Sequence, residues 1–379
     1  MSEDTETLRL LRDAAAGMAK FDGPRLRGLR TTPGTIDRKT WSALAEQGWL
    51  SALVPEADGG LGLGIAAAAV IAERLGYGCM PEPFVAAGVM TPYLLGRSTN
   101  AALKAARLPK VLDGSRLLTL AWQGEAGSLS IDEAHVTASE SNREAILNGT
   151  SRFVPAPAAD AFLVLTRRPD GPAIYWIDRA TPGLQVTNEP LADRSASGWL
   201  RFTKAHIPAA NSVAGPAQAK ELVAAAVDLG LIAQSAELVG NMERALDMTL
   251  AYMRTRKQFG QAIGSFQSLQ HRAVDLWMAK ELARHAVTAA VRLASDPAVT
   301  GRARGAAASS AKNRAAESAM LIAKQTIHLH GAIGTTDEYD LGLYVNRMVA
   351  SMPWLGNAAA HRQRYAALAP ARERVSAHA

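Results

Sequence analysis

The feature that most constrains this chain is an unbroken helical pattern from Glu221 to Phe259, ELVAAAVDLGLIAQSAELVGNMERALDMTLAYMRTRKQF. It contains no proline, and its apolar residues recur at the three-to-four-residue spacing of a helix. A single helix of this length is about 55 Å long, at roughly 1.5 Å per residue. That is more than one small domain needs.

The rest of the chain changes periodicity twice. Helical spacing also runs from about Asp4 to Gly114, with the glycine-rich stretch PEADGGLGLG (residues 55–64) as a loop. From Arg116 to about Ala214 the pattern becomes short segments separated by turn residues, such as LLTLAW, AFLVLTR, AIYWID and LRFTKAHI. We therefore predict an α+β multidomain fold: an N-terminal α-helical domain (1–115), a middle β-barrel or sandwich (116–214), and a C-terminal domain resembling a four-helix bundle (215–379).

Composition excludes several classes of protein. The 379 residues are 48% hydrophobic, which is enough to bury sizeable cores, and the single cysteine, Cys79, allows no internal disulfide. No uninterrupted apolar run is long enough to span a bilayer, and the acidic N-terminus does not look like a secretory signal, so we expect a cytoplasmic protein without a membrane role. The net charge of +6 is spread along the chain, which gives little support to nucleic-acid binding.

Four segments, in order, resemble the acyl-CoA dehydrogenase family over nearly the whole chain. They are GWLSALVPEADGGLGLG with the AERLG helix, the β segments EAGS and ILNGTSRFV, the stretch RKQFGQAIGSFQSLQHR (residues 256–272), and HLHGAIGTTDEYDLGLYVNR (residues 328–347). The resemblance implies FAD as cofactor and dehydrogenation between the α and β carbons of an acyl-CoA substrate from fatty acid or steroid catabolism. It also implies an electron-transfer flavoprotein or similar acceptor, and a homo- or heterotetramer with a related dehydrogenase subunit.

The resemblance assigns a cofactor-binding arm to the turn that follows the long helix. In this family the Arg and Phe of the R-x-x-F-G turn, and a Gln soon after it, reach the FAD of a neighbouring subunit. The assignment suits the chemistry, because a guanidinium offers fixed donors to a pyrophosphate. The residues that it covers here are Arg256, Gln258, Phe259, Gln267, His328, Gly331 and Ala332. His328 and Ala332 depart from the family, which usually has Gln and Gly there, and the plain alternative for Arg256 is a helix C-terminal cation.

The catalytic base of the family is missing from both of its known locations. Counting from Glu338-Tyr339 to the commoner location, with one extra residue allowed, gives Gly356, and counting back from Arg256 to the other gives Gly230. Glycine cannot abstract a proton. Glu237 lies two turns after Gly230 on the same helix face, so we nominate it as a displaced base, with Arg244 as a possible salt-bridge partner on that face. Asp228 and Asp337 are interpreted as a helix-surface acid and a turn acid.

The flavin-binding segments of the β-domain are also altered. Where the family reads T-E-P-x-A-G-S, residues 122–128 read WQGEAGS, which lose the threonine and keep Ser128, a candidate substrate-binding residue. Where the family reads W-I-T, this chain has Phe153, Val154 and Pro155. No metal site is expected, because isolated histidines such as His135 and His206 lack ligand spacing.

Three interpretations stay open from the sequence. The chain is a catalytically silent subunit of a heteromeric dehydrogenase, since its base positions and flavin segments are eroded while its arm is intact. Alternatively it is a competent homotetrameric dehydrogenase that uses Glu237. The third is a non-enzymatic binding protein on the same fold, which the basic pI near 9.5 permits.

Overall fold

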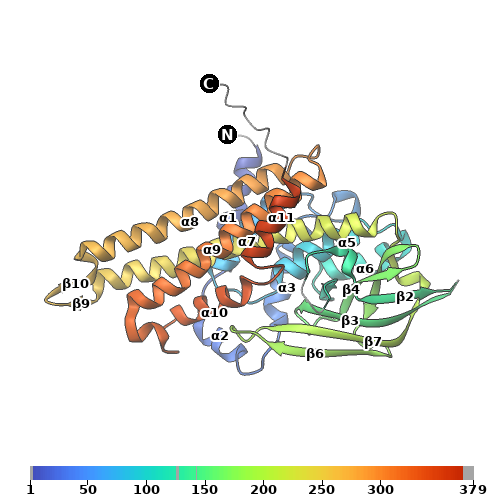
Figure 1. The fold of residues 1–379 in the computed structure, drawn as a ribbon, viewed down its shortest axis with the longest axis horizontal. Coiled ribbons are helices and arrows are strands. Elements are labelled where there is room, and N and C mark those ends of the chain that lie inside the picture. The colour runs from blue at the N-terminus through green and yellow to red at the C-terminus, as the bar shows by residue number, and fades with distance from the viewer. Residues whose placement is uncertain (1–2, 125–127, 142, 370–379) are drawn as a thin grey trace, which may run out of the picture.

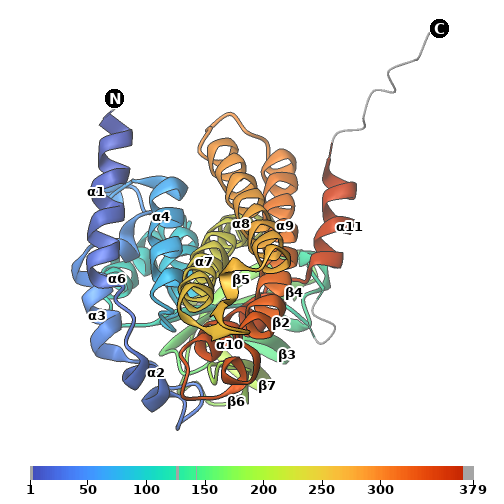
Figure 2. The ribbon, with the colours of Figure 1, turned by 90° about the vertical axis from the view of Figure 1, so that its left-hand side faces the viewer.

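The computed structural model describes residues 3–124, 128–141 and 143–369. Helices at both ends of the chain flank a sheet built from its middle, in the order that the periodicity predicts (Figure 1). The N-terminal helices lie on one side of the long helix α7 and helix α11 lies on the other (Figure 2). The predicted fold class is confirmed, whereas the domain boundaries at 115 and 214 stay a prediction.

The N-terminal part is a group of short helices with polar caps. Asp22, Asp37 and Asn100 each accept backbone hydrogen bonds at a helix start, as N-caps do. The predicted helix around WSALAEQGWLSALV is shorter than the pattern, because Gly48 adopts φ 73° and leaves only a 3₁₀ turn after it. The helices are α1 (Glu3–Met18), α2 (Gly23–Leu29), α3 (Arg38–Glu46), α4 (Gly64–Tyr77), α5 (Thr91–Gly96) and α6 (Ala101–Leu112), with a π-helical segment at Phe84–Met90.

The middle part is one eight-stranded sheet. Its strands are β1 (Leu118–Ala121), β2 (Val136–Glu140), β3 (Glu144–Pro155), β4 (Ala161–Arg168), β5 (Gly171–Asp178), β6 (Leu184–Pro190), β7 (Ala196–Pro208) and β8 (Ser212–Ala214). They follow the order β6-β7-β3-β2-β4-β5-β8, with β1 added on β4. Most pairs are antiparallel as expected, but β1 and β2 both pair with β4 in parallel, which makes the sheet mixed. Local periodicity does not reveal this, because strand direction depends on which distant strand is the neighbour.

The C-terminal part is built on the long predicted helix, α7 (Ala219–Thr255). A two-stranded hairpin, β9 (Lys257–Gln258) and β10 (Gln261–Ala262), leads to α8 (Gln267–Ala294), α9 (Gly301–His330), α10 (Leu341–Ser351) and α11 (Ala358–Leu368). By length and mean hydropathy α7 would qualify as a membrane span, although polar residues interrupt its apolar sequence. Its most apolar window is 89% buried in the molecule, so α7 is the core helix.

Paired glycines bring α4 against α7. A Cβ on Gly240 would lie 1.9 Å from the carbonyl oxygen of Glu73, and a Cβ on Gly76 would lie 2.1 Å from that of Glu237. Real Cβ atoms do not approach so closely, so only glycine permits this separation of the helices. The contact fixes the turn of α7 that carries Glu237.

Candidate functional site

A cavity of about 1280 Å³ lies between the N-terminal helices, the sheet and the C-terminal helices. It exceeds the usual range of small-molecule pockets, which is roughly 300–1,000 Å³. Its wall includes the π-helical segment (Phe84 to Ala86), Gln123 and Ser128 near β1, the β6–β7 loop, and the segment from Ala350 to Asn357. Of the predicted site residues, Glu237, Gly356 and Ser128 line this cavity, and Gly230 does not.

Glu237 is held in a buried group of charges. Nε and Nη2 of Arg347 donate to its Oε1 at 3.0 and 2.6 Å, while Nη1 donates to Oδ2 of Asp193 at 3.0 Å. Burial would lower the pKa of Arg347, but the two carboxylates outweigh it and raise that pKa. Arg347 therefore stays charged, and it ties α7 and α10 to the β6–β7 loop. The expected partner, Arg244, lies instead over the ring of Tyr77.

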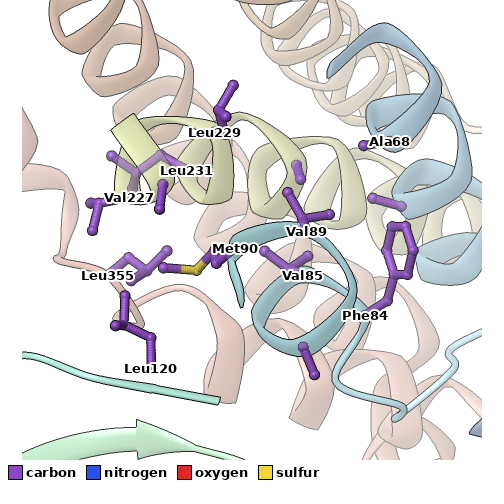
Figure 3. Packing of buried hydrophobic residues seen from close by; sticks show 14 of the residues in the cluster. Ala68, Phe84, Val85, Val89, Met90, Leu120, Val227, Leu229, Leu231 and Leu355 are labelled. Carbon is purple, nitrogen blue, oxygen red and sulfur yellow. The ribbon is translucent and has the colours of Figure 1, made fainter. Parts of the chain in front are cut away.

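The space in front of Gly230 is filled. A Cβ on Gly230 would lie 2.7 Å from the sulfur of Met90 and 3.4 Å from Cδ1 of Leu355. Figure 3 shows Met90 and Leu355 beside the turn of α7 that carries Val227 and Leu231. Both side chains are buried, so the small residue does not enlarge the cavity.

Gly356 lies in a turn that disfavours a side chain. Its φ is 102°, and a Cβ there would lie 2.9 Å from both Nε2 of His361 and Cδ1 of Leu129. Its neighbour Leu355 also has a positive φ, 58°, and carries the side chain that covers Gly230. A larger residue at 356 would be strained in this backbone conformation.

The β-domain side of the cavity is lined by polar as well as apolar side chains, among them Gln123, Ser130, Arg194, Ser195 and Ser197. Ser128 is half-buried, and its Oγ accepts from the backbone N–H of Ser130 at 3.1 Å. Phe153, at φ 57°, lines the same wall. Residues 125–127 of the EAGS segment lie outside the described residues.

The thiol of Cys79, which lines this cavity, is not a reactive nucleophile. Burial raises the pKa of Cys79 to about 12, so the thiol is protonated at neutral pH. Across the part of the chain that the structure describes, no three Cys, His, Asp or Glu side chains gather as metal ligands would. His135 and His206 are exposed, as expected.

Asp228 is not the surface acid that the sequence suggested. It is buried, and its carboxylate accepts from Arg364 at 2.7 Å and from Arg304 at 3.3 Å. Burial raises its pKa against the opposing effect of Arg364. The helical pattern could not show this, because both arginines lie more than 70 residues away along the chain. Asp337 is an exposed turn acid, as predicted, and pairs with Arg30 at 2.6 Å.

The predicted arm projects from the far end of α7. Gln258 pairs with Gln261, so Phe259 and Gly260 form a two-residue hairpin turn with φ 52° and 82°. Positive φ at both central positions is typical of a type I′ turn, which favours Asn-Gly. Phe259 instead places an aromatic ring there, and that residue is 92% exposed.

The other predicted arm residues lie at the same end of the helical bundle. Arg256 and Gln267 are exposed, and Nη1 of Arg272 on α8 lies 3.4 Å from Nδ1 of His328 on α9. Gly331 and Ala332 follow as exposed residues of a 3₁₀ turn. Among the described residues, Arg256 makes no side-chain hydrogen bond or ion pair, but it occupies the C-cap of α7.

The arm and the cavity are separate sites on one chain. Arg256 follows Glu237 by nineteen positions, about 28 Å along a helix. An arginine side chain cannot span that distance. Arg256 therefore cannot reach the part of the cavity that Glu237 lines.

Comparisons with known proteins agree over most of the chain. Models of the acyl-CoA dehydrogenase N-terminal and C-terminal domains match residues 5–115 and 221–368. The chain is 31% identical to acyl-CoA dehydrogenase FadE27 of Mycobacterium tuberculosis over 314 residues, 82% of each protein. Among solved structures it is similar to a variant of the Tcur3481–Tcur3483 steroid ACAD (30% identity, TM-score 0.85, 96% of this chain and 98% of that one). It is also similar to the ChsE4–ChsE5 complex from M. tuberculosis (28% identity, TM-score 0.85, 97% of both chains).

Proposed function

Because this chain belongs to the acyl-CoA dehydrogenase family, whose cofactor is FAD, we propose that it is the base-less subunit of a heteromeric acyl-CoA dehydrogenase. One observation carries the proposal. The space beside Gly230, where a base would stand, is closed by Met90 and Leu355, while Phe259 and Arg256 are exposed on an arm that cannot reach Glu237.

The segments that carry Gly230 and Gly356 approach each other, and this supports the absence of a base. The two family locations serve one reaction, so they must approach the same point. The side chain that approaches Gly230 belongs to Leu355, one residue before Gly356, so we assign the commoner location to Leu355. An aliphatic side chain there abstracts no proton, just as a glycine would not.

The second candidate, a homotetramer that uses Glu237, is less well supported. Glu237 lines the cavity, but its Oε1 already accepts two hydrogen bonds from Arg347. That oxygen is occupied by the guanidinium, and it would have to leave Arg347 to approach a substrate carbon. This geometry favours the silent-subunit proposal.

The partner would complete a site that both chains build. FAD, when bound, accepts hydride from the β carbon of the substrate. Arg256 and Gln267 of this chain would hold the cofactor seated in the partner, with Phe259 covering an apolar edge of it. Of the two flavin-binding segments named from the sequence, Ser128 keeps a hydroxyl, whereas Phe153 offers no side-chain donor to a flavin of its own.

An exposed apolar face supports association with another subunit. Val274, Trp277, Met278 and Leu282 lie at helical spacing along α8, and each is about half exposed. Such a contiguous face is typical of a protein interface. The chain is similar to Tcur3481–Tcur3483 and to ChsE4–ChsE5, and each of these names joins two different proteins. We therefore propose a heterotetramer.

The substrate class follows from the same relatives. Tcur3481–Tcur3483 is described as a steroid ACAD. We propose that the complex containing this chain likewise acts on a bulky, steroid-like acyl-CoA. An electron-transfer flavoprotein as acceptor and a cytoplasmic location stay predictions.

The test is the visible flavin absorbance of the full-length protein, purified alone and co-expressed with a related dehydrogenase subunit encoded beside it. We expect a colourless homomer, and a yellow complex that oxidises an acyl-CoA with an artificial electron acceptor. Arg256→Ala should remove flavin from the complex, whereas Arg254→Ala, an exposed arginine two residues earlier, should not. A yellow homomer that turns over, and that loses turnover in Glu237→Gln, would contradict the proposal.

A further inference from the structure

The inner wall of the cavity contains an amide with no acceptor. Gln234 on α7 lines the cavity and is 2% exposed. Its Nε2 is buried and donates to no group among the described residues. A buried donor without an acceptor costs free energy, so a wall meant only for hydrocarbon would be better served by a leucine.

A buried lysine lies behind the same wall. Lys312 on α9 is fully buried, and its Nζ donates to the carbonyl oxygen of Ser351, the last residue of α10, at 3.2 Å. Within the described structure that is its one hydrogen bond, although an amine has at least two N–H groups to offer. Burial lowers its pKa to about 7, with Glu237 acting in the opposite direction.

A third buried polar group, His361, lies near Lys312. Nε2 of His361 lies 2.8 Å from the carbonyl oxygen of Leu355, so that nitrogen carries the proton and donates it. Its Nδ1 is then an acceptor, is buried, and has no donor among the described residues. Burial, and next the charge of Lys312, lower the pKa of His361 to about 4, which keeps the ring neutral near pH 7.

We propose that the cavity of this chain binds an acyl-CoA whose acyl group carries an oxygen atom, as a hydroxyl or carbonyl, and that Gln234 Nε2 donates to that oxygen. The inference rests on the proposed function only in taking an acyl-CoA as the ligand. Ser351 and Leu355, whose carbonyl oxygens accept from Lys312 and His361, line the same cavity as Gln234. A hydrocarbon acyl chain would bury the amide and leave it unpaired.

Calorimetric titration of the full-length protein, in the assembly that co-expression yields, tests this preference. The probes are unbranched acyl-CoA thioesters of increasing length and the same series with a terminal hydroxyl. At the best-matched length we expect the hydroxylated thioester to bind about ten-fold more tightly, the effect of one hydrogen bond to an otherwise unpaired buried group. Equal or weaker binding at every length would mean that the amide is satisfied by water, and would overturn the inference.

Matched variants locate the effect. Gln234→Leu should abolish the preference for the hydroxylated series and leave binding of the hydrocarbon series intact. Gln185→Leu, on an exposed face of β6, should keep the preference. If the melting curve shows that Gln234→Leu does not fold, Gln234→Asn takes its place. Its side chain is one methylene shorter, so its amide lies farther from the ligand and the preference should fall. Unchanged preference in a folded Gln234 variant would also overturn the inference. Binding is read without turnover, so an active yellow homomer would end the silent-subunit proposal and leave this result standing.

Discussion

At the scale of single residues, the charges around Arg347 decide what the cavity can do. One guanidinium satisfies Glu237 and Asp193, all three side chains being largely buried. Removal of the shared cation would leave two carboxylates without a partner in a low-dielectric wall. Breaking a buried pair in this way costs far more than losing an exposed pair, because the remaining charge keeps its desolvation penalty.

We expect Arg347→Leu to lower the free energy of unfolding by about 3–5 kcal/mol. Arg362→Leu breaks the exposed pair with Glu317 and should cost no more than about 1 kcal/mol. Urea unfolding of both variants measures the difference. Similar losses in the two would show that the Arg347 group is as solvated as the surface pair.

At the scale of elements, the β9–β10 hairpin combines two unfavourable features in Phe259. A non-glycine residue at positive φ is strained, and an aromatic ring loses favourable burial when it is left in water. Neither feature benefits the isolated chain. Both are explained if the ring is buried against a cofactor or another subunit.

Phe259→Asn keeps a residue suited to the turn and removes the aromatic ring, so it tests the two features separately. Asparagine suits the first central position of a type I′ turn, so the melting temperature of the isolated chain should stay the same or rise. The flavin content of the complex should fall, while Phe259→Tyr, which keeps an aromatic ring, should retain flavin. Full flavin retention in Phe259→Asn would show that the ring of Phe259 does not hold the cofactor and that the hairpin only connects α7 and α8.

At the scale of the whole molecule, the helical bundle carries an apolar face along α8 that the described part of the chain does not cover. Trp277 and Leu282 are exposed, although α8 also contributes buried residues such as Leu276 to the core. A helix with apolar residues on two faces has two partners. The second is another subunit in our proposal.

Charged residues on this face should prevent assembly without unfolding the chain. We expect the double variant Trp277→Glu and Leu282→Glu to sediment as a monomer, while Leu10→Glu, at an exposed leucine on α1, leaves the assembly unchanged. Analytical ultracentrifugation, with circular dichroism to verify folding, provides the measurement. An intact assembly in the double variant would place the interface elsewhere.

The sequence by itself determined the order of helical and β segments and the family, and it located the segment that we propose as the arm. These are local properties: helical periodicity, strand-length apolar runs, and a motif in which Arg256, Phe259 and Gln267 lie close together along the chain. Glycines at both expected base positions were also visible, and they pointed to a missing base.

Only the tertiary structure decided what fills the space beside Gly230 and what Glu237 contacts. Met90 and Leu355 reach Gly230 from the π-helical segment and from the loop after α10, and Arg347 reaches Glu237 from α10. The sequence carried no signal for these contacts, or for the burial of Asp228, because each joins residues far apart along the chain. Which side chain fills a cavity, or neutralises a charge, depends on the packing of whole elements, and local periodicity does not encode that.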